Sequence, residues 1–204
     1  MSRVVLPETY YCNEDVVFLA KDLLGKLIQV AHSDGIVSAL ITETEAYAGV
    51  VDKASHAYNG RRTSRTEVMY QTGGVAYVYL CYGVHYLFNV VTGPENVPHA
   101  VLIRGVVPFE GVDLMVARRN LKTAHYKDFN GPGKLTSALG INITHNAARL
   151  TDGTIQILDT GIRIAENEII TSKRIGVDYA AEDALLPYRF QVTEPWMAKK
   201  NVLF

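Results

Sequence analysis

Residues 100–107 form an almost continuous apolar run, Ala-Val-Leu-Ile-Arg-Gly-Val-Val, in which Arg104 is the single charged residue. A run of this length with many β-branched residues is typical of a strand that is buried in a sheet. A charged side chain inside such a strand needs a partner, because the burial of an unpaired charge is strongly unfavourable. The run therefore predicts a sheet protein that has at least one buried ion pair.

Other apolar segments have the alternation, or the β-branched and aromatic content, that is typical of strands. These segments are residues 26–32, 36–45, 75–82, 86–92, 154–170 and 189–193. A Ser33-Asp34-Gly35 turn joins the first two, and Gly83 separates the third from the fourth, so each pair predicts a hairpin. The second strand brings Glu43, Glu45 and Tyr47 to its end.

Helices are predicted between and after these strands, from start signals and apolar periodicity. They cover residues 13–25, 110–121, 130–140 and 180–186, and a capping-box spacing at 64–67 opens a further short helix. We find no internal repeat, low-complexity tract or linker, so a single mixed α/β domain is the simplest expectation.

The composition, with 48% hydrophobic and 20% charged residues, excludes a wholly disordered or collagen-like chain. No apolar stretch is long enough to cross a bilayer, and the first residues lack the features of a secretory signal. We therefore expect a cytoplasmic protein without a membrane partner, compatible with a bacterial cell. The formal net charge of −1 argues against bulk electrostatic coating of nucleic acid but is compatible with a local basic face.

The two cysteines, Cys12 and Cys81, belong to no Cys-x-x-Cys pattern. Neither a disulfide framework nor a zinc site is expected, and both side chains are predicted to be buried thiols. His56 likewise has no His-x-x-x-His or His-Glu-x-x-His spacing that would make it a metal ligand. The sequence therefore predicts no metal and no cofactor.

Glu45 is the strongest candidate for chemistry, because a strand end beside a glycine-containing loop can hold a carboxylate rigidly as a general base. The alternative is a solvated strand end, which is the usual environment of a glutamate. The functional interpretation is favoured by the residues in segments expected to adjoin this strand. These are Tyr47, His56, Tyr77, Tyr79, Tyr82, Asn89 and Arg104. An aromatic slot with an amide, an imidazole and one carboxylate suits a flat, nitrogen-rich ligand.

The tyrosines and the basic residues also have plainer interpretations. Tyrosine spaced by two residues packs one face of a sheet, although Tyr82 precedes Gly83 and would be presented by a turn for stacking. Arg61, Arg62 and other basic residues are either solvated charges or a face that neutralises phosphates. Residues 131–134, Gly-Pro-Gly-Lys at a predicted helix start, could bind an anion.

Six stretches follow one another in a family-specific order over most of the chain. They are ITETEAY (41–47), ASHAYNGRRTSRTEVMY (54–70), AYVYLCYGVHYLFNV (76–90), AVLIRGVVPFEG (100–111), NGPGKLTSALGI (130–141) and RIGVDYA (174–180). Together they resemble the alkyladenine DNA glycosylases, also called methylpurine DNA glycosylases. The resemblance implies one mixed α/β domain over residues 1–204 with a curved, largely antiparallel sheet, flanking helices and a protruding hairpin. It is not a helix-hairpin-helix fold.

The activity that the resemblance implies is base excision. Such an enzyme flips 3-methyladenine, 7-methylguanine, hypoxanthine or ethenoadenine from double-stranded DNA and hydrolyses the N-glycosidic bond, which leaves an abasic site. Glu45 resembles the general base that activates water, and Arg104 resembles the arginine that helps to hold that water and the flipped nucleotide. The main-chain carbonyl near Ile175 would be a further ligand of the water.

The resemblance also implies how substrate is held. Tyr47 and Tyr79 would enclose the base together with His56. Tyr82 resembles the residue that fills the gap left in the duplex, and Asn89 the amide that crowds the 2-amino group of guanine. Stacking on an aromatic ring offsets part of the cost of extruding a base.

Two alternatives to a monofunctional, monomeric glycosylase stay open from the residues alone. Lys134 near a helix start could act as an amine nucleophile in a bifunctional glycosylase/lyase. A non-catalytic module could instead use Tyr82, Arg61, Arg62 and Lys134 only to recognise damaged or distorted DNA.

Overall fold

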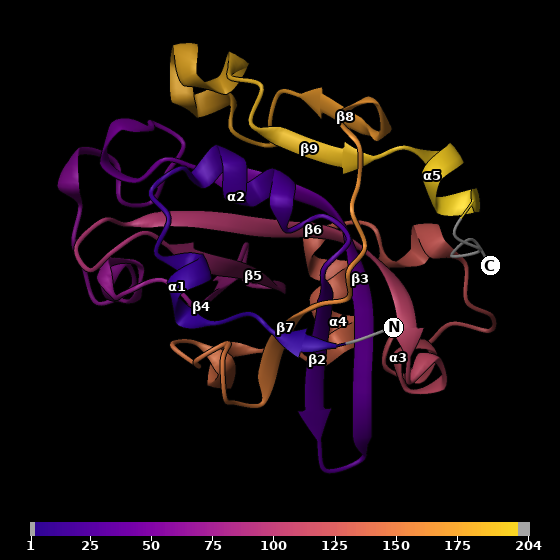
Figure 1. Ribbon diagram of the computed structural model, residues 1–204. Coiled ribbons are helices and arrows are strands. Elements are labelled where there is room, and N and C mark those ends of the chain that lie inside the picture. The colour runs from indigo at the N-terminus through magenta and orange to yellow at the C-terminus, as the bar shows by residue number, and fades with distance from the viewer. Residues whose placement is uncertain (1–2, 200–204) are drawn as a thin grey trace.

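The apolar run of residues 100–107 lies within β6 (His99–Glu110), which pairs with β3 (Gly35–Tyr47) over nearly the whole length of both strands. This pair is the centre of a nine-stranded sheet in the computed structural model, which describes residues 3–199. The strand order is β1-β7-β2-β3-β6-β5-β4, and every pairing is antiparallel. The sheet is not closed, and β8 and β9 lie along its upper side in Figure 1.

The remaining elements have the following bounds. The other strands are β1 (Val4–Val5), β2 (Leu27–His32), β4 (Ala76–Cys81), β5 (His85–Thr92), β7 (Ile155–Asp159), β8 (Ile169–Ser172) and β9 (Arg189–Val192). The α-helices are α1 (Glu8–Tyr11), α2 (Val16–Asp22), α3 (Val112–Arg118), α4 (Pro132–Leu139) and α5 (Glu194–Lys199). Short 3-10 helices are η1 (Gly49–Val51), η2 (Tyr58–Gly60), η3 (Glu67–Tyr70), η4 (Tyr126–Phe129), η5 (Ile143–His145), η6 (Glu166–Glu168) and η7 (Asp178–Leu185).

The main core lies between the sheet and its helices. Helix α2 packs against β3 and β6, and α4 packs against β5 and β6 (Figure 1). Leu19 of α2, Leu135 of α4 and Phe88 of β5 are almost completely buried there. The expected mixed α/β fold, with a large antiparallel sheet flanked by helices, is confirmed.

The two faces of strand β3 carry different kinds of side chain: one packs against helix α2, and the other bears the carboxylates. The Thr44 hydroxyl faces α2 and donates a hydrogen bond to the Ala20 carbonyl oxygen at 2.7 Å. Since successive strand residues point to opposite faces, Glu43 and Glu45 lie on the other face. Both of them contact Arg104 of the neighbouring β6 there. The alternation thus keeps the carboxylates away from the helix-covered core.

Strand β3 also changes partners along its length. Residues up to Leu40 pair with β2, whereas Glu43, Thr44 and Glu45 pair with β9. The part of β3 that carries the two carboxylates is therefore held between β6 and a strand from near the C-terminus.

Several helix boundaries differ from those predicted. Helix α2 begins at Val16 rather than Asn13, because Asp15 is the cap: its carboxylate accepts the Phe18 N–H at 2.8 Å. Asn13 instead accepts the Asp15 N–H at 2.8 Å in the preceding turn. Helix α2 ends at Asp22, not at residue 25, and α3 is shorter than the predicted 110–121.

Two further local predictions are wrong. The capping box at 64–67 does not form, because the Glu67 carboxylate pairs with Arg62 at 2.7 Å instead of reaching back to the helix start. The helix predicted at 180–186 is the 3-10 segment η7, which a positive φ of 50° at Ala181 interrupts.

Cys12 and Cys81 are unpaired and half-buried, not fully buried as predicted. Within residues 3–199, no helix combines the length and the apolar character that spanning a bilayer requires.

Candidate active site

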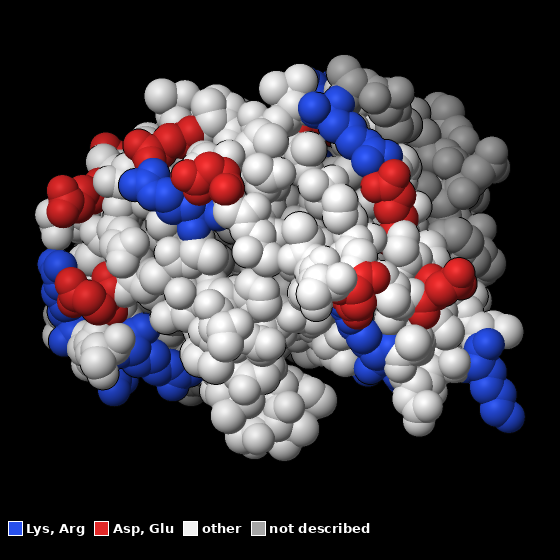
Figure 2. Space-filling model, turned by 90° about the horizontal axis from the view of Figure 1, so that it is seen from below, with Lys and Arg blue, Asp and Glu red and all other residues white. Residues whose placement is uncertain are grey.

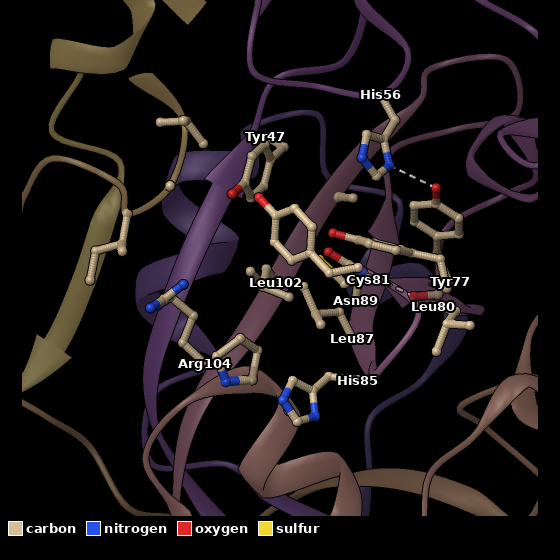
Figure 3. Close-up of a pocket in the computed structure, with 18 of the residues that line it drawn as sticks. Tyr47, His56, Tyr77, Leu80, Cys81, His85, Leu87, Asn89, Leu102 and Arg104 are labelled. Atoms are coloured by element: carbon tan, nitrogen blue, oxygen red, sulfur yellow. Dashed lines mark hydrogen bonds between the residues drawn. The ribbon is translucent and has the colours of Figure 1, made fainter. Parts of the chain in front are cut away.

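An open cavity of about 600 Å³ lies where β4, β5, β6 and the end of β3 meet two loops and the start of α4. Figure 3 shows Tyr47 and His56 on one side of this cavity and Arg104 and His85 on the other. Ligand sites of roughly 300–1,000 Å³ accept small organic molecules, so a purine base fits within this volume. The walls combine aromatic and aliphatic side chains with four basic ones, Arg65, Arg104, Arg119 and Lys134.

Glu45 lies directly behind this wall and is completely buried. One carboxylate oxygen, Oε1, accepts the Ile175 N–H at 2.9 Å and lies 3.4 Å from Arg104 Nε. The other oxygen accepts the Tyr47 hydroxyl at 2.8 Å. Tyr47, Arg104 and Ile175 all line the cavity, whereas Glu45 itself does not. The alternative of a solvated strand end is therefore wrong.

The environment of Glu45 acts on its pKa in opposite directions. Burial raises the pKa of the carboxyl above its usual range. The Arg104 guanidinium, the Ile175 N–H and the Tyr47 hydroxyl favour the ionised form and limit that increase. A carboxylate with a raised pKa is a stronger base, which is what proton abstraction from water near neutral pH requires.

Arg104 is the charged residue for which the sequence required a partner, and it has two. Its Nε donates to Glu43 Oε1 at 3.1 Å and lies 3.4 Å from Glu45 Oε1. Glu43 also accepts Arg189 Nε at 2.6 Å, so two arginines flank one buried glutamate. This arrangement fixes the direction of the Arg104 side chain, and the guanidinium forms part of the cavity wall.

The aromatic side of the cavity is a packed group of rings. His56 and Tyr79 have ring centroids 4.8 Å apart, and Tyr77 and Tyr79 are 5.2 Å apart. His56 Nδ1 and the Tyr77 hydroxyl form a 2.8 Å hydrogen bond (Figure 3). The Arg65 guanidinium covers the Tyr79 ring at 4.7 Å. The rings therefore hold one another in place before any ligand arrives.

His56 is neutral at physiological pH. Burial lowers the pKa of its imidazole to about 4, with help from the Arg65 and Arg61 charges. A neutral imidazole does not repel a cationic ligand, and tyrosine faces attract one. The imidazole thus adds no positive charge to this side of the cavity, where the Arg65 guanidinium already lies over the Tyr79 ring.

Tyr82 stands at the tip of the β4–β5 hairpin with 94% of its surface exposed. Its φ of 49° is unusual for an aromatic residue. Such strained conformations cluster at functional sites. Asn89 lies deeper, on β5, where its side-chain NH2 group donates to the Tyr77 carbonyl oxygen at 3.0 Å (Figure 3). Both residues line the same cavity.

The basic residues predicted to contact DNA are placed differently from one another. Lys134 lines the cavity in the first turn of α4. Arg61 is exposed in the loop before η3, and Arg62 is engaged by Glu67 and by the Asn96 side chain. Figure 2 shows a face on which basic and acidic side chains lie next to one another near the rim and the visible centre is uncharged. That face has no continuous basic field.

Sequence reasoning missed two ion-pair groups at this site. Glu43 and Arg189 support Arg104, and a buried Asp52–Arg174 pair lies against Tyr47. The alternation along β3 could have indicated that Glu43 lies beside Glu45 at the site, since residues two apart in a strand share a face. No local pattern indicates that Asp52 and Arg174 meet. Within residues 3–199, no group of three or more metal-ligating side chains comes together.

The site thus combines a buried carboxylate, an arginine beside it and an aromatic cavity of the size of a purine base. The family model described as methylpurine-DNA glycosylase matches residues 10–195. The chain belongs to this family, and it is a monofunctional DNA glycosylase, a hydrolase of N-glycosidic bonds in DNA repair.

Curated relatives cover nearly the whole chain. A Chlamydia felis protein is 48% identical over 188 residues, which is 91% of this chain and 95% of that protein. Relatives from Desulfitobacterium hafniense and Bdellovibrio bacteriovorus are 42% and 39% identical, covering 90% and 97% of this chain and 93% and 100% of their own lengths. All three carry the provisional name 3-methyladenine DNA glycosylase.

Proposed function

We propose that this protein flips alkylated or deaminated purines out of duplex DNA into the cavity and hydrolyses their N-glycosidic bond. The substrates are 3-methyladenine, 7-methylguanine, hypoxanthine and ethenoadenine. The observation that carries the proposal is the burial of Glu45 behind Tyr47, Arg104 and Ile175, at the wall of an aromatic cavity. The provisional name shared by the bacterial relatives supports methylated adenine as one substrate. We further propose a bacterial cytoplasm as the setting.

Glu45 is the general base in this mechanism. A water molecule that enters beside Arg104, or displaces the Tyr47 hydroxyl, meets a carboxylate whose pKa burial has raised. The carboxylate takes a proton as the water oxygen bonds to C1′, and the bond between C1′ and the base nitrogen breaks with its electron pair left on the base. A cationic alkylated purine then departs as a neutral base, whereas hypoxanthine or ethenoadenine also gains a proton from solvent as it departs. Arg104 holds the water and the nucleotide, and the Ile175 main chain borders the same position.

The cavity favours damaged over normal purines through charge. A purine alkylated at N3 or N7 is cationic, so it leaves readily and is attracted to a tyrosine face. In Tyr47 and Tyr79 this is the face opposite the one that Arg174 or Arg65 covers. The neutral His56 adds surface without adding positive charge. Lesions that pair poorly also cost less to extrude from the duplex.

Release of bases from defined duplexes tests the proposal. Duplexes with one hypoxanthine or one ethenoadenine, and methylated genomic DNA, are incubated with the protein in EDTA and analysed before and after alkali. Strand cleavage only after alkali is expected, and borohydride should trap no covalent complex through Lys134. Tight binding to lesions without any base release would instead favour a recognition module.

Tyr82→Ala is expected to weaken base flipping by about 5- to 100-fold, since stacking of one base on an aromatic ring contributes about 1–3 kcal/mol. The ring is almost wholly exposed, so its loss should leave the folded structure intact. Fluorescence of 2-aminopurine next to the lesion measures flipping. The order of preference among lesions should persist, and a changed order with normal flipping would contradict the role of Tyr82.

Asn89→Ala should relax discrimination against guanine, because in this proposal the amide crowds the 2-amino group of that base. The amide is buried at the cavity wall and held by the Tyr77 carbonyl oxygen, which supports this role. Loss of one such contact is expected to raise guanine release about 10-fold or more relative to hypoxanthine. Release of guanine from undamaged or mispaired duplexes is the measurement. Guanine release equal to that of the unaltered protein would exclude this role for Asn89.

A further inference from the structure

The loop that follows β8 carries a buried ion pair directly beside the site. The side chains of Arg174 and Asp52 are 0% and 1% exposed. The guanidinium engages both carboxylate oxygens of Asp52, with Nη2 to Oδ1 at 2.8 Å. Two parallel charge-assisted hydrogen bonds fix both distance and orientation.

This pair ties together three segments that are distant in sequence. Arg174 also donates to the main-chain oxygen of Ala46 on β3 at 2.9 Å and to that of Asp183 in η7 at 3.1 Å. Asp52 accepts the N–H groups of Ala48 and Ala54, both at 3.0 Å. The end of β3, the loop of residues 48–56 and the loop of residues 174–183 therefore meet at one ion pair.

Two contacts extend from the pair to Glu45. The Arg174 guanidinium lies over the Tyr47 ring at 4.8 Å, and the Tyr47 hydroxyl donates to Glu45. The residue after Arg174 is Ile175, whose N–H donates to the other Glu45 oxygen. Both hydrogen bonds that Glu45 accepts from neutral donors thus come from groups that Arg174 holds in place.

We propose that Arg174 and Asp52 are positioning residues for the reaction, which fix the Tyr47 hydroxyl and the Ile175 N–H against the Glu45 carboxylate. The proposal rests on the proposed function in that Glu45 acts there as the base. Neither residue touches the substrate, since both lie behind the cavity wall. Removal of the ion pair should therefore change the pKa and the hydrogen bonds of Glu45, and not only the stability of the fold.

The charged and polar groups around Glu45 determine its pKa, so a measured pKa distinguishes a positioning role of the ion pair from a purely structural one. Arg104 faces the carboxylate from β6, Glu43 and Tyr47 from β3, and the Ile175 N–H from the loop. Arg189 of β9 acts on it through Glu43. Loosening of Tyr47 and Ile175 removes groups that favour the ionised form, whereas Arg104, Glu43 and Arg189 stay where they are. The pKa of Glu45 should then rise.

The test uses Arg174→Lys, which keeps the charge opposite Asp52 but loses the planar fork and the contact with the Tyr47 ring. The pKa of Glu45 is measured by carbon NMR of protein labelled at the glutamate side-chain carboxyl, with Glu45→Gln assigning the signal. We expect an increase of about half a unit or more. Single-turnover excision of ethenoadenine should slow by about 10- to 100-fold near neutral pH. In a profile of excision rate against pH, the fall in rate on the acidic side should move to higher pH.

Three further variants keep the test decisive. Asp52→Glu keeps the charge opposite Arg174 but misplaces the carboxylate by one methylene group, which disturbs the bidentate geometry. It should give the same rise in the pKa of Glu45 and the same slower excision, and it replaces Arg174→Lys if that variant folds poorly. Arg163→Lys alters a bidentate pair with Asp159 on the surface, and Ile157→Val weakens the core on β7. These two control variants should leave unchanged both the pKa of Glu45 and the excision rate per folded protein molecule.

An unaltered pKa of Glu45 in both charge-conserving variants, Arg174→Lys and Asp52→Glu, would overturn the proposal whatever the excision rate. The proposal would also be overturned if Ile157→Val, compared at the same fraction of folded protein, slowed excision as much as Arg174→Lys does. Absence of base release by the unaltered protein would overturn the proposed function alone, because the NMR comparison does not depend on activity.

Discussion

Glu45→Gln is expected to abolish base excision while DNA binding stays intact. General base catalysis contributes about 10²- to 10⁴-fold, and the amide cannot accept a proton from water. The substitution keeps the shape of the side chain, and its oxygen can still accept the Ile175 N–H. Single-turnover release of hypoxanthine and ethenoadenine should fall by about 10³-fold or more.

Binding and folding serve as the controls for this variant. The affinity for lesion-containing duplex should change by less than about threefold, because contacts with the phosphates dominate affinity for DNA. Glu166→Gln, at an exposed position, should excise at the rate of the unaltered protein. Excision by Glu45→Gln within tenfold of the unaltered rate would remove Glu45 from the mechanism.

Arg104→Met is expected to reduce both excision and stability. Loss of one preorganised charged donor typically costs about 10²- to 10³-fold in rate. Glu43 keeps Arg189 as a partner, whereas Glu45 loses the only cation within salt-bridge distance in the described part of the chain. Breaking a buried pair from one side costs about 3–5 kcal/mol of unfolding free energy. Methionine fills a similar volume, so that packing is largely conserved.

The stability loss in Arg104→Met should depend on pH in a defined direction. Burial raises the pKa of Glu45, and removal of Arg104 takes away the largest opposing influence. A carboxyl whose pKa is higher in the folded than in the unfolded state binds protons preferentially in the folded state. The difference in unfolding free energy from the unaltered protein should therefore shrink as pH falls through the raised pKa of Glu45.

Urea unfolding at a series of pH values measures this difference. Arg104→Lys keeps the charge and should recover most of the stability, although less of the rate, because the ammonium lacks the fork of donors. A stability deficit that stays constant or grows at acidic pH would contradict a pairing between Arg104 and Glu45.

The sequence was most informative where chemistry and strand pattern coincide. The run of residues 100–107 predicted a buried strand with a partnered arginine, and alternation placed Glu45 and Tyr47 at one strand end. These features are local: a strand needs only its own residues to show its period. Both hairpins were predicted on the same basis, with turn residues adding the positions of the reversals.

The ion pairs that support the site could not be predicted from local sequence patterns. Asp52 and Arg174 are 122 positions apart, and neither lies in a periodic segment that would give its direction. The capping box at 64–67 failed for a related reason, since Arg62 offered Glu67 a charged partner that the spacing rule ignores. Long-range ion pairs depend on how loops meet, which a local pattern does not contain.

The partner change along β3 has a consequence for synthesis of the chain on the ribosome. Glu43 and Glu45 are completed on one side by β9, which also supplies Arg189. Residues 35–110 contain β3, β4, β5 and β6, which pair with one another, so this ladder can form while the chain is still growing. The carboxylate site closes only when residues 189–191 have left the exit tunnel. The arrangement of the two carboxylates seen in the folded protein is thus completed only after nearly all of the chain has been made.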